Sequence, residues 1–590
     1  MREFAVPALV EVPAGAGVSD AVFDRAARNP GQIAFRRRKD DSWFPVTIGD
    51  FKNEVVRAAK GLIASGIEPG DRVAIISRTR YEWTVLDYAI WAAGAVTVPI
   101  YETSSVEQIS WIIEDSGARA VFAETDALRT SVQQAGGTQI WSLESGGMAE
   151  LVETGEQLGD AKVQERRTSR TGADLATLIY TSGTTGRPKG CELTHANFTE
   201  LARNVAAGPL TEVVVNGSST LLFLPLAHVF ARAIQVVCLE AGVILGHSPN
   251  ITDLLPDLAS FQPDFLLAVP RVFEKVYNGA EQKAAAGGKT KIFHAAADVA
   301  IAYSRARQDG RPGIGLKAKH AVFDKLVYGK LREAVGGRVR YSVSGGAALG
   351  ERLGHFFDGV GITILEGYGL TETTAPITVN SPSALRIGTV GRPVPGVSVR
   401  IADDGEILAQ GINIFDGYWN NETATKESFE DGWFRTGDLG SLDDDGYLRI
   451  TGRKKEILVT AGGKNVAPAP LEDLVRAHPL VSQCLVVGDG RPFIAALVTL
   501  DAEAIVAWQE ANGLAGRSVA ELAAEPLVIA EIDKAVAAAN VSVSHAEQIK
   551  KVRILATDFT VENEYLTPSL KVKRNVVVRD FAADVDAIYG

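Results

Sequence analysis

The chain has 590 residues, of which 46% are apolar and 22% are charged, values typical of a globular protein with more than one domain. Its formal net charge of −12 argues against nucleic acid as the main partner, because nucleic-acid-binding proteins are usually basic. The three cysteines, at positions 191, 238 and 484, are too far apart for a disulfide framework or a zinc site, which favours the reducing cytoplasm.

The N-terminal residues lack the apolar segment of a signal peptide, so we expect no leader sequence there. The most apolar stretch, Trp83 to Ile100, contains Asp87 and a proline near its end. It predicts a buried helix followed by a strand rather than a membrane-spanning helix. Peripheral contact with a membrane stays open, because such contact needs no spanning helix.

Strands and helices alternate in the first third of the chain, which is typical of right-handed βαβ units in a mostly parallel sheet. The predicted elements are strands at 72–77, 95–99 and 118–123 and a helix at 81–93. A second helix is expected to begin at a capping box of Ser104 and Glu107 and to end at Glu114. Residues 136–171 are polar and show no period, so we expect a surface excursion there.

Several strands of the middle third end in glycine-rich or polar loops. The predicted elements are strands at 175–181, 220–224, 265–269, 339–344 and 362–366 and a helix at 317–334. In open α/β sheets ligands gather at the carboxyl ends of the strands. These loops are therefore the expected walls of one site.

The pattern of predicted elements changes at about residue 388. Short strands and Asp-Gly turns follow and indicate a β subdomain that extends to residue 451. A new α/β pattern follows. We assign residues 1–451 to a large N-terminal α/β domain of mostly parallel sheets, which includes the β subdomain. The pattern changes at residues 452–456, where we place the domain boundary, and residues 457–590 are predicted to form a small α+β C-terminal domain.

The segment Thr181 to Gly190 carries four hydroxyl groups, three glycines and two cations. Successive backbone N–H groups in such a loop form a concave anion site, and Lys189 adds a charge suited to phosphate. The spacing is not that of a Walker A loop, which requires Gly-x-x-x-x-Gly-Lys-Ser/Thr. The composition thus favours a phosphate cradle over the alternative, a flexible surface loop.

Seven motifs follow one another in order, and together they closely resemble the adenylate-forming (ANL) superfamily. They are Tyr180–Gly190, Leu224–His228, Ser344–Ala347, Glu366–Glu372, Phe434–Asp438, Thr451–Glu456 and Leu566–Lys571. The first motif, Tyr-Thr-Ser-Gly-Thr-Thr-Gly-x-Pro-Lys-Gly, is highly specific, whereas the shorter ones are strong only in series. The segment Pro270 to Tyr277 and the Leu-Thr-Pro-x-x-Lys ending resemble long-chain fatty-acid–CoA ligases of the actinobacterial type.

This resemblance implies a two-step reaction that uses ATP, Mg²⁺ and coenzyme A. A fatty-acid carboxylate attacks the α-phosphate of ATP to give acyl-AMP and pyrophosphate, and the thiol of CoA then displaces AMP. The chemistry needs charge neutralisation and in-line positioning of two anions more than covalent help. The resemblance also implies that residues 452–456 are a hinge and that the C-terminal domain is mobile and rotates about it between the two steps.

The family pattern also assigns site residues. The implied ATP- and AMP-binding residues are Thr181, Ser182, Gly183, Thr184, Thr185, Gly186, Lys189, Gly345, Gly346, Ala347, Glu366, Gly367, Tyr368, Gly369, Thr371, Asp438 and Arg453. Among them, Tyr368 is expected to stack on adenine and Thr371 to contact the α-phosphate. Asp438 is expected to accept the ribose hydroxyls. Glu372, with Thr184, is expected to hold Mg²⁺, a hard cation that prefers oxygen ligands.

Further residues are implied in catalysis and domain motion. His228 is expected beside the acyl carboxylate, and Lys571 is expected to be the mobile lysine of the C-terminal domain that bridges the carboxylate and the α-phosphate. Lys455 is the expected hinge residue, and the expected CoA-facing loop is Gly462, Gly463 and Lys464. The family usually has glycine before the mobile lysine, whereas this chain has Leu570. Lys573 is therefore an alternative to Lys571.

Other interpretations stay open. Taken alone, His228 or Glu372 would more often be structural, and the segment that follows Lys571 could be a solvated basic run. The chain could load an acyl carrier protein instead of CoA, or it could be a nucleotide-binding scaffold without turnover. The acyl tunnel is expected near Pro225 to Arg232 and Val269 to Tyr277. Neither chain-length preference nor oligomeric state is indicated.

Overall fold

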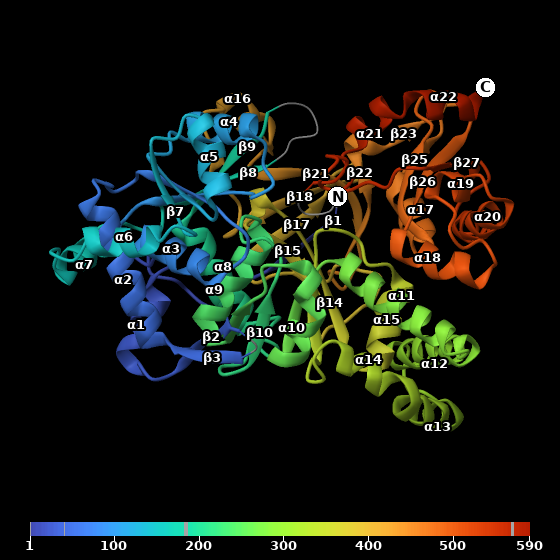
Figure 1. The fold of residues 1–590 in the computed structure, drawn as a ribbon, viewed down its shortest axis with the longest axis horizontal. Coiled ribbons are helices and arrows are strands. Elements are labelled where there is room, and N and C mark those ends of the chain that lie inside the picture. The colour runs from blue at the N-terminus through green and yellow to red at the C-terminus, as the bar shows by residue number, and fades with distance from the viewer. Residues whose placement is uncertain (1, 41, 182–186, 568–570) are drawn as a thin grey trace.

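The computed structural model describes residues 2–40, 42–181, 187–567 and 571–590. Figure 1 shows a large body formed by the first three quarters of the chain, with the C-terminal part lying beside it. The body contains strands covered by helices, so the predicted α/β class is confirmed.

A seven-stranded sheet in the order β19-β9-β8-β5-β4-β6-β7 forms the first layer. Its strands are β4 (Arg72–Ile76), β5 (Val96–Ile100), β6 (Ala120–Ala123), β7 (Gln139–Ser142), β8 (Leu175–Thr181), β9 (Lys189–Thr194) and β19 (Gly417–Tyr418). The five strands from β8 to β7 are parallel, whereas β9 and β19 add an antiparallel edge. β8 and β9 thus form a hairpin, and the predicted phosphate loop joins them.

The predicted strands and helices of this layer are confirmed within a few residues. The apolar stretch that begins at Trp83 forms α3 (Tyr81–Ala92) and then β5, both buried along their whole length. A helix that is apolar on every side must lie inside the protein, and α3 packs between the sheet and α2 (Ile48–Ala64). The capping box of α4 (Val106–Ser116) is formed by Ser105 and Gln108, one residue later than predicted.

The prediction of a surface excursion at 136–171 is wrong. This segment contains β7, which pairs with β6, and two helices, α6 (Gly147–Thr154) and α7 (Asp160–Thr168). α6 and α7 bury few side chains each, and the main apolar ones are Leu151 and Val163. So few apolar residues leave no detectable period in the sequence, and tertiary contacts decide the structure instead.

Two further sheets complete the core of the body, in the orders β10-β11-β2-β3 and β12-β13-β14-β15-β16. Their strands are β2 (Ile33–Lys39), β3 (Ser42–Thr47), β10 (Ser219–Leu222), β11 (Ile244–His247), β12 (Phe265–Ala268), β13 (Tyr341–Ser344), β14 (Thr363–Leu370), β15 (Ala375–Val379) and β16 (Arg392–Pro393). The nearby helices include α8 (His195–Ala207), α9 (Val229–Ala241), α11 (Pro270–Ala286) and α15 (Glu351–Val360).

Two predictions for this region need correction. The strand predicted to end at Glu366 continues as β14 to Leu370, because from Gly367 it pairs with β15. The helix predicted at 317–334 is three pieces, namely α13 (Ile314–Phe323), a π-helical turn (Asp324–Tyr328) and α14 (Gly329–Ala334).

The predicted β subdomain contains a six-stranded sheet in the order β1-β17-β18-β21-β20, with β22 paired to β21. Its strands are β1 (Arg2–Val6), β17 (Val397–Ile401), β18 (Glu406–Gly411), β20 (Phe429–Glu430), β21 (Trp433–Leu442) and β22 (Leu448–Arg453). The sequence did not indicate that β1, from the N-terminus, pairs with β17.

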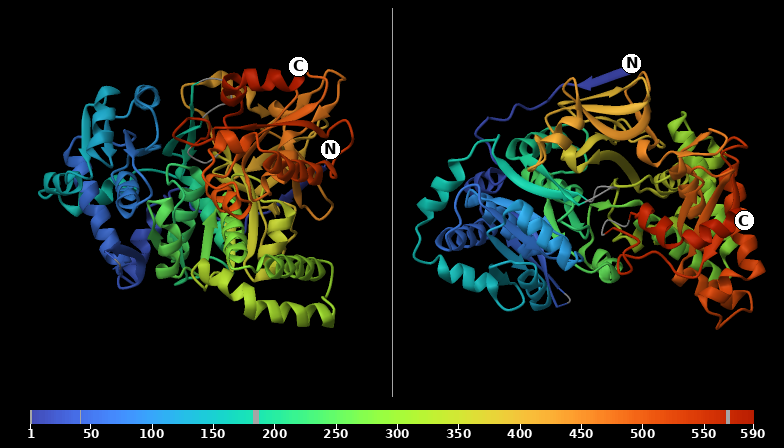
Figure 2. Two further views of the ribbon diagram at one scale, coloured as in Figure 1. Left: turned by 45° about the vertical axis from the view of Figure 1, so that its right-hand side comes forward. Right: turned by 90° about the horizontal axis from the view of Figure 1, so that it is seen from above.

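The C-terminal part has a sheet of β25 (Val481–Val487), β26 (Ile494–Leu500) and β27 (Ile549–Leu555). Helices α17 (Pro468–Arg476), α18 (Ala502–Ala511) and α20 (Pro526–Asn540) pack beside it. Its two hydrophobic clusters draw only on residues between 458 and 589. Figure 2 shows this part against one side of the body. A core of its own supports a separate domain, while the proposed hinge at 452–456 stays a prediction.

Candidate active site

A cavity of about 2440 Å³ lies where the body and the C-terminal part meet. Its walls include sixteen of the residues that the motifs predicted for the site. They are Thr181, Lys189, His228, Gly345, Gly346, Ala347, Glu366, Gly367, Tyr368, Gly369, Thr371, Glu372, Asp438, Arg453, Lys455 and Lys571. Segments up to 390 residues apart in the sequence therefore meet at one place.

Other predicted residues do not line this cavity. Ser182, Gly183, Thr184, Thr185 and Gly186 lie outside the described residues. Residues 462–464 form an exposed turn between β23 (Leu458–Val459) and β24 (Asn465–Val466), away from the cavity walls. The last of them, Lys464, forms an ion pair with Glu547 at 3.4 Å.

Asp438 lies at the centre of a small polar network. It is opposite Arg453 on the paired strands β21 and β22, and the Arg453 Nε donates to Asp438 Oδ1 at 2.9 Å. The Tyr368 hydroxyl donates to Asp438 Oδ2 at 2.7 Å. Burial and the Asp438 charge together raise the pKa of Tyr368 well above its usual value. Each carboxylate oxygen keeps a free lone pair, so Asp438 can still accept from a ligand.

The cavity wall that follows β13 is formed by Gly345, Gly346 and Ala347. A Cβ added to Gly345 would lie 3.3 Å from the Phe230 ring, so a larger residue would push that ring aside. Across this wall, the Leu349 N–H donates to Glu366 Oε1 at 3.1 Å. Burial raises the pKa of Glu366 to about 7, and the nearby Asp473 carboxylate adds to the rise.

Glu372 has a partner that the motifs did not predict. The Tyr418 hydroxyl donates to Glu372 Oε1 at 2.8 Å, and the Lys189 Nζ lies 4.8 Å from the centre of the Tyr418 ring. Burial and the charge of Glu372 raise the pKa of Tyr418. Tyr418 belongs to β19, which reaches the site only because it pairs with β9. That long-range pairing leaves no local signal in the sequence.

The residues around Glu372 fit a magnesium ion. Glu372 Oε2 makes no hydrogen bond to a described residue, and Glu372 and Thr371 both line the cavity. No group of three or more His, Cys, Asp or Glu side chains in the described ranges could enclose a metal. Mg²⁺ is commonly held by one or two carboxylates together with substrate phosphates and water, so a sparse donor set suits it.

His228 caps the N-terminus of α9. Its Nδ1 accepts from the Phe230 N–H at 3.1 Å, so the neutral ring carries its proton on Nε2. Burial lowers the pKa of His228 to about 4, and the charge of Lys571 contributes to the shift. The imidazole is therefore a neutral donor near pH 7.

Lys571 reaches the cavity from the loop that precedes α21 (Arg574–Asp580). Its side chain lines the cavity and is exposed, and protein lies on several sides of it. The resulting desolvation, reinforced by the Arg453 charge, lowers the pKa of Lys571, while Asp438, Glu456 and Glu372 oppose the shift. Lys573 also lines the cavity.

One end of the cavity is apolar. Its wall comes from α8, α9 and the segment after α8, namely Leu201, Val205, Leu210, Val229, Ala233, Ile234 and Val237. The predicted neighbourhood Pro225 to Arg232 contributes Val229 and Phe230. The other predicted neighbourhood contributes Glu274 and Tyr277, a polar region where Arg352 lies over the Tyr277 ring at 4.7 Å. The contribution of α8 was not predicted.

Comparisons with known proteins identify the family of the chain. A family model described as AMP-binding enzyme matches residues 22–419, and one described as AMP-binding enzyme C-terminal domain matches residues 455–590. The chain is 53% identical to FadD15, a long-chain-fatty-acid–CoA ligase of Mycobacterium bovis, and the match covers all of both chains.

Two solved structures share the fold. One is an anthranilate CoA ligase in complex with anthranoyl-AMP, with a TM-score of 0.73 and 18% identity over 97% of this chain and 99% of that chain. The other is an O-succinylbenzoate coenzyme A synthetase from Bacillus subtilis in complex with ATP and magnesium ion. Its TM-score is 0.67, with 21% identity over 94% of this chain and 98% of that chain. At these identities the likeness is evidence for the fold alone.

Proposed function

The chain belongs to the AMP-binding enzyme family, and we propose on that basis that it is an AMP-forming long-chain-fatty-acid–CoA ligase. The observation that carries this proposal is the 53% identity with a ligase of that activity over the full length of both chains. The enzyme uses ATP, Mg²⁺, a fatty acid and coenzyme A. The products are acyl-CoA, AMP and pyrophosphate.

In the first step, the residues around the cavity would position two anions. We propose that Asp438 and Arg453 hold the ribose end of ATP and that Tyr368 lies against adenine. Thr371 and Lys189 face the phosphates, and Glu372 would hold Mg²⁺, which neutralises phosphate charge when bound. Their common location on one cavity supports these roles.

His228 and Lys571 would act on the reacting carboxylate. The neutral His228 can donate its Nε2–H to a carboxylate oxygen, while the Lys571 ammonium neutralises the charge that develops between the carboxylate and the α-phosphate. Both residues line the same cavity, which supports these roles. This proposal favours Lys571 over Lys573 as the mobile lysine.

For the second step, we propose that the C-terminal domain rotates about Lys455. Lys455 is exposed in a short 3-10 turn (Lys454–Glu456), where a change of backbone angles would disturb little packing. The rotation would withdraw Lys571 and bring Gly462, Gly463 and Lys464 to the cavity. In this structure residues 462–464 lie away from the cavity, as expected for the domain arrangement of the first step.

The acyl chain would occupy the apolar end of the cavity between α8 and α9. His228, at the start of α9, lies where this apolar end joins the polar region. An alkyl chain bound there would leave water at about 0.8 kcal/mol per CH₂ group, which favours long chains.

We also propose a cytoplasmic location with peripheral membrane contact. The three cysteines are free and buried, as expected in a reducing compartment. Within the described ranges, every helix is too short or too polar to cross a membrane. A ligase whose substrate partitions into lipid would gain from a surface that contacts the bilayer.

The test of this function is a pair of assays on the full chain. ATP–pyrophosphate exchange should depend on fatty acid and increase with chain length, and thioester should form with free CoA. Thioester formation only on a phosphopantetheinylated carrier protein would contradict the assignment of CoA as the acceptor. Absence of fatty-acid-dependent exchange would contradict the ligase assignment itself.

A further inference from the structure

A helical hairpin projects from the body of the molecule. It consists of α12 (Thr290–Gln308) and α13, followed by the π-helical turn Asp324–Tyr328. Figures 1 and 2 show both helices at the edge of the molecule, with α13 outermost. No residue of α13 is buried, so one of its faces is open to solvent along its whole length.

The open face of α13 carries an apolar stripe. Ile314 is 88% exposed and Val322 is 57% exposed, and in the following turn Leu326 is 56% exposed. Residues four apart in a helix lie within about 40° of one another, so Ile314, Ala318 and Val322 share one side. Large aliphatic side chains exposed in a row are unusual on a soluble protein and mark a contact surface.

Lysines flank this stripe on both sides. At about 100° per residue, Lys317 and Lys319 lie on opposite edges of the stripe, and Lys325 follows one turn later. All three are exposed, and none forms an ion pair with a described residue. A long lysine side chain beside an apolar stripe can place its ammonium group in a polar layer above it.

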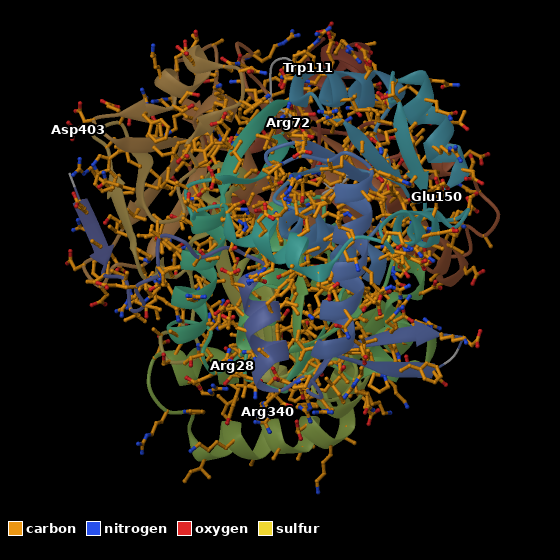
Figure 3. All side chains as sticks on the ribbon, turned by 90° about the vertical axis from the view of Figure 1, so that its left-hand side faces the viewer. Arg28, Arg72, Trp111, Glu150, Arg340 and Asp403 are labelled. Atoms are coloured by element: carbon orange, nitrogen blue, oxygen red, sulfur yellow. The ribbon has the colours of Figure 1, made fainter. Side chains whose placement is uncertain are left out.

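The opposite face of α13 is fixed against the body. His320 Nε2 lies 2.6 Å from the Gly359 carbonyl oxygen, and its ring stacks on Tyr303 of α12 with centroids 3.9 Å apart. The orientation of α13 is therefore set by packing, which holds the apolar stripe outward. Figure 3 shows side chains of this helix directed away from the body at its lower edge.

The charge of the hairpin is opposite to that of the chain. Between Lys289 and Arg332 there are ten Lys and Arg residues and three Asp and Glu residues, an excess of seven positive charges. The whole chain has 60 Lys and Arg residues and 72 Asp and Glu residues. A local excess of this size attracts anionic surfaces even though the protein as a whole is acidic.

We propose that this surface docks the enzyme on an anionic lipid bilayer. The α13 surface is defined by Ile314, Val322 and Leu326 together with Lys317, Lys319 and Lys325. The aliphatic side chains enter the boundary between headgroups and acyl chains, while the lysines bind anionic headgroups. The α13 surface is thus the proposed location of the membrane contact described above. This assignment rests on the proposed function, because the bilayer would supply fatty acid to the ligase.

Other occupants fit the α13 surface less well. Nucleic acid would match the lysines but offers no apolar region for Ile314 and Val322. A second copy of the chain would bring two basic faces together, which like-charge repulsion opposes. A bilayer provides an anionic layer for the lysines and an apolar layer for the aliphatic side chains along the whole exposed side of the helix.

Sedimentation with lipid vesicles tests this surface. The full chain should bind vesicles of phosphatidylglycerol and phosphatidylcholine, bind phosphatidylcholine alone much less, and be released by salt. The double variant Lys317→Glu/Lys319→Glu should lose at least about tenfold in vesicle affinity. Ile314→Ser/Val322→Ser should also weaken binding at low salt, because it removes the apolar contact, and it should leave the salt dependence of the remaining binding unchanged.

A charge-matched control uses lysines elsewhere. Lys426→Glu/Lys550→Glu changes the net charge by the same amount, on α16 (Glu422–Glu427) and β27, and should bind vesicles as the parent chain does. Figure 1 places α16 at the opposite edge of the molecule from α13. Equal losses in both double variants would overturn the α13 surface, as would failure of the parent chain to bind anionic vesicles. Binding to random-sequence DNA but not to vesicles would overturn the choice of a bilayer.

Vesicle binding and catalysis are separable outcomes. With a soluble fatty acid and no vesicles, Lys317→Glu/Lys319→Glu should keep the parental rate of acyl-CoA formation, because the α13 surface lies outside the cavity. An inactive parent chain that still binds vesicles through α13 would contradict the proposed function and leave the docking surface intact. A parent chain that is active but does not bind lipid would contradict the docking surface and leave the proposed function intact.

Discussion

At the scale of single residues, the cavity sets the charge states of its own side chains. Burial keeps His228 neutral, because its pKa falls to about 4, and it also lowers the pKa of Lys571. The carboxylates of Asp438, Glu456 and Glu372 oppose the shift at Lys571 and favour its charged form. A neutral donor and a cation thus line the same cavity, which is the combination that the proposed attack of a carboxylate on a phosphate would need.

Replacement of Lys571 tests the role of this cation. Lys571→Ala should lower the rate of acyl-AMP formation by about 100-fold or more, because a charge aimed at the transition state is lost. Thioester formation from supplied acyl-AMP and CoA should be unchanged. The measurements are ATP–pyrophosphate exchange and thioester release, with Lys573→Ala as the matched control. A loss of exchange in Lys573→Ala alone would shift the mobile lysine by two residues.

Tyr418 offers a second test at this scale. Tyr418→Phe removes the hydrogen bond to Glu372 and frees that carboxylate to move. A hydrogen bond to a charged group contributes about 1.5 kcal/mol, so KM for MgATP should rise by about tenfold, with less effect on the KM for fatty acid. The control is Tyr341→Phe, whose hydroxyl has no hydrogen bond to a described residue. Equal effects on both KM values would argue against a role through Glu372.

At the scale of elements, β14 positions the motif that begins at Glu366, which we propose binds the nucleotide. Its first half pairs in parallel with β13, and its second half pairs in antiparallel with β15, with a register shift between Tyr368 and Gly369. The strand thus continues into the site and holds Tyr368 opposite Asp438. A loop, as the sequence predicted, would leave Tyr368 less constrained.

The close approach of β14 and β15 predicts a sensitive glycine. A Cβ on Gly369 would lie 1.6 Å from the Ala375 carbonyl oxygen, so Gly369→Ala must separate the two strands. We expect a loss of about 1–3 kcal/mol in the free energy of unfolding, together with weaker ATP binding. Gly279→Ala is the control, since nothing lies within 4 Å of that position inside α11. It should be neutral or slightly stabilising, as measured by denaturant unfolding.

At the scale of the whole molecule, charged groups join the body to the C-terminal part. The Arg271 Nη2 of α11 lies 3.0 Å from Asp501 Oδ2 at the start of α18. Glu366 of β14 and Asp473 of α17 both line the cavity at this junction, and burial raises the pKa of each to about 7. Their protonation therefore bears on how firmly the two parts associate.

The pH dependence of stability follows from the direction of these shifts. Both carboxyls have a folded-state pKa above the ordinary value, so the folded chain binds more protons, and the stability this contributes is lost as pH rises through about 7. We expect a lower Tm at about pH 8 than at about pH 6, and a smaller difference in Asp473→Asn. Calorimetry at the two pH values checks this. An unchanged or larger difference in Asp473→Asn would contradict it.

The sequence predicted most of what is local. The strands before the phosphate loop and His228, the buried helix at α3 and the succession of motifs all depend on residues close together in the chain. It did not predict β7, because a strand of four residues is specified by pairing with β6. It did not predict that α8 walls the apolar end of the cavity, because that follows from the packing of α8 on α9.

The sequence by itself determined the family of this protein, because the seven short motifs that indicate it depend on residues close together in the chain. Only the tertiary structure decided which side chains from distant segments contact one another. Tyr418 contacts Glu372 because β19 pairs with β9, and the stripe on α13 is open because His320 fixes the opposite face. Such contacts depend on strand pairing and burial between distant segments, and no local pattern of residues encodes them.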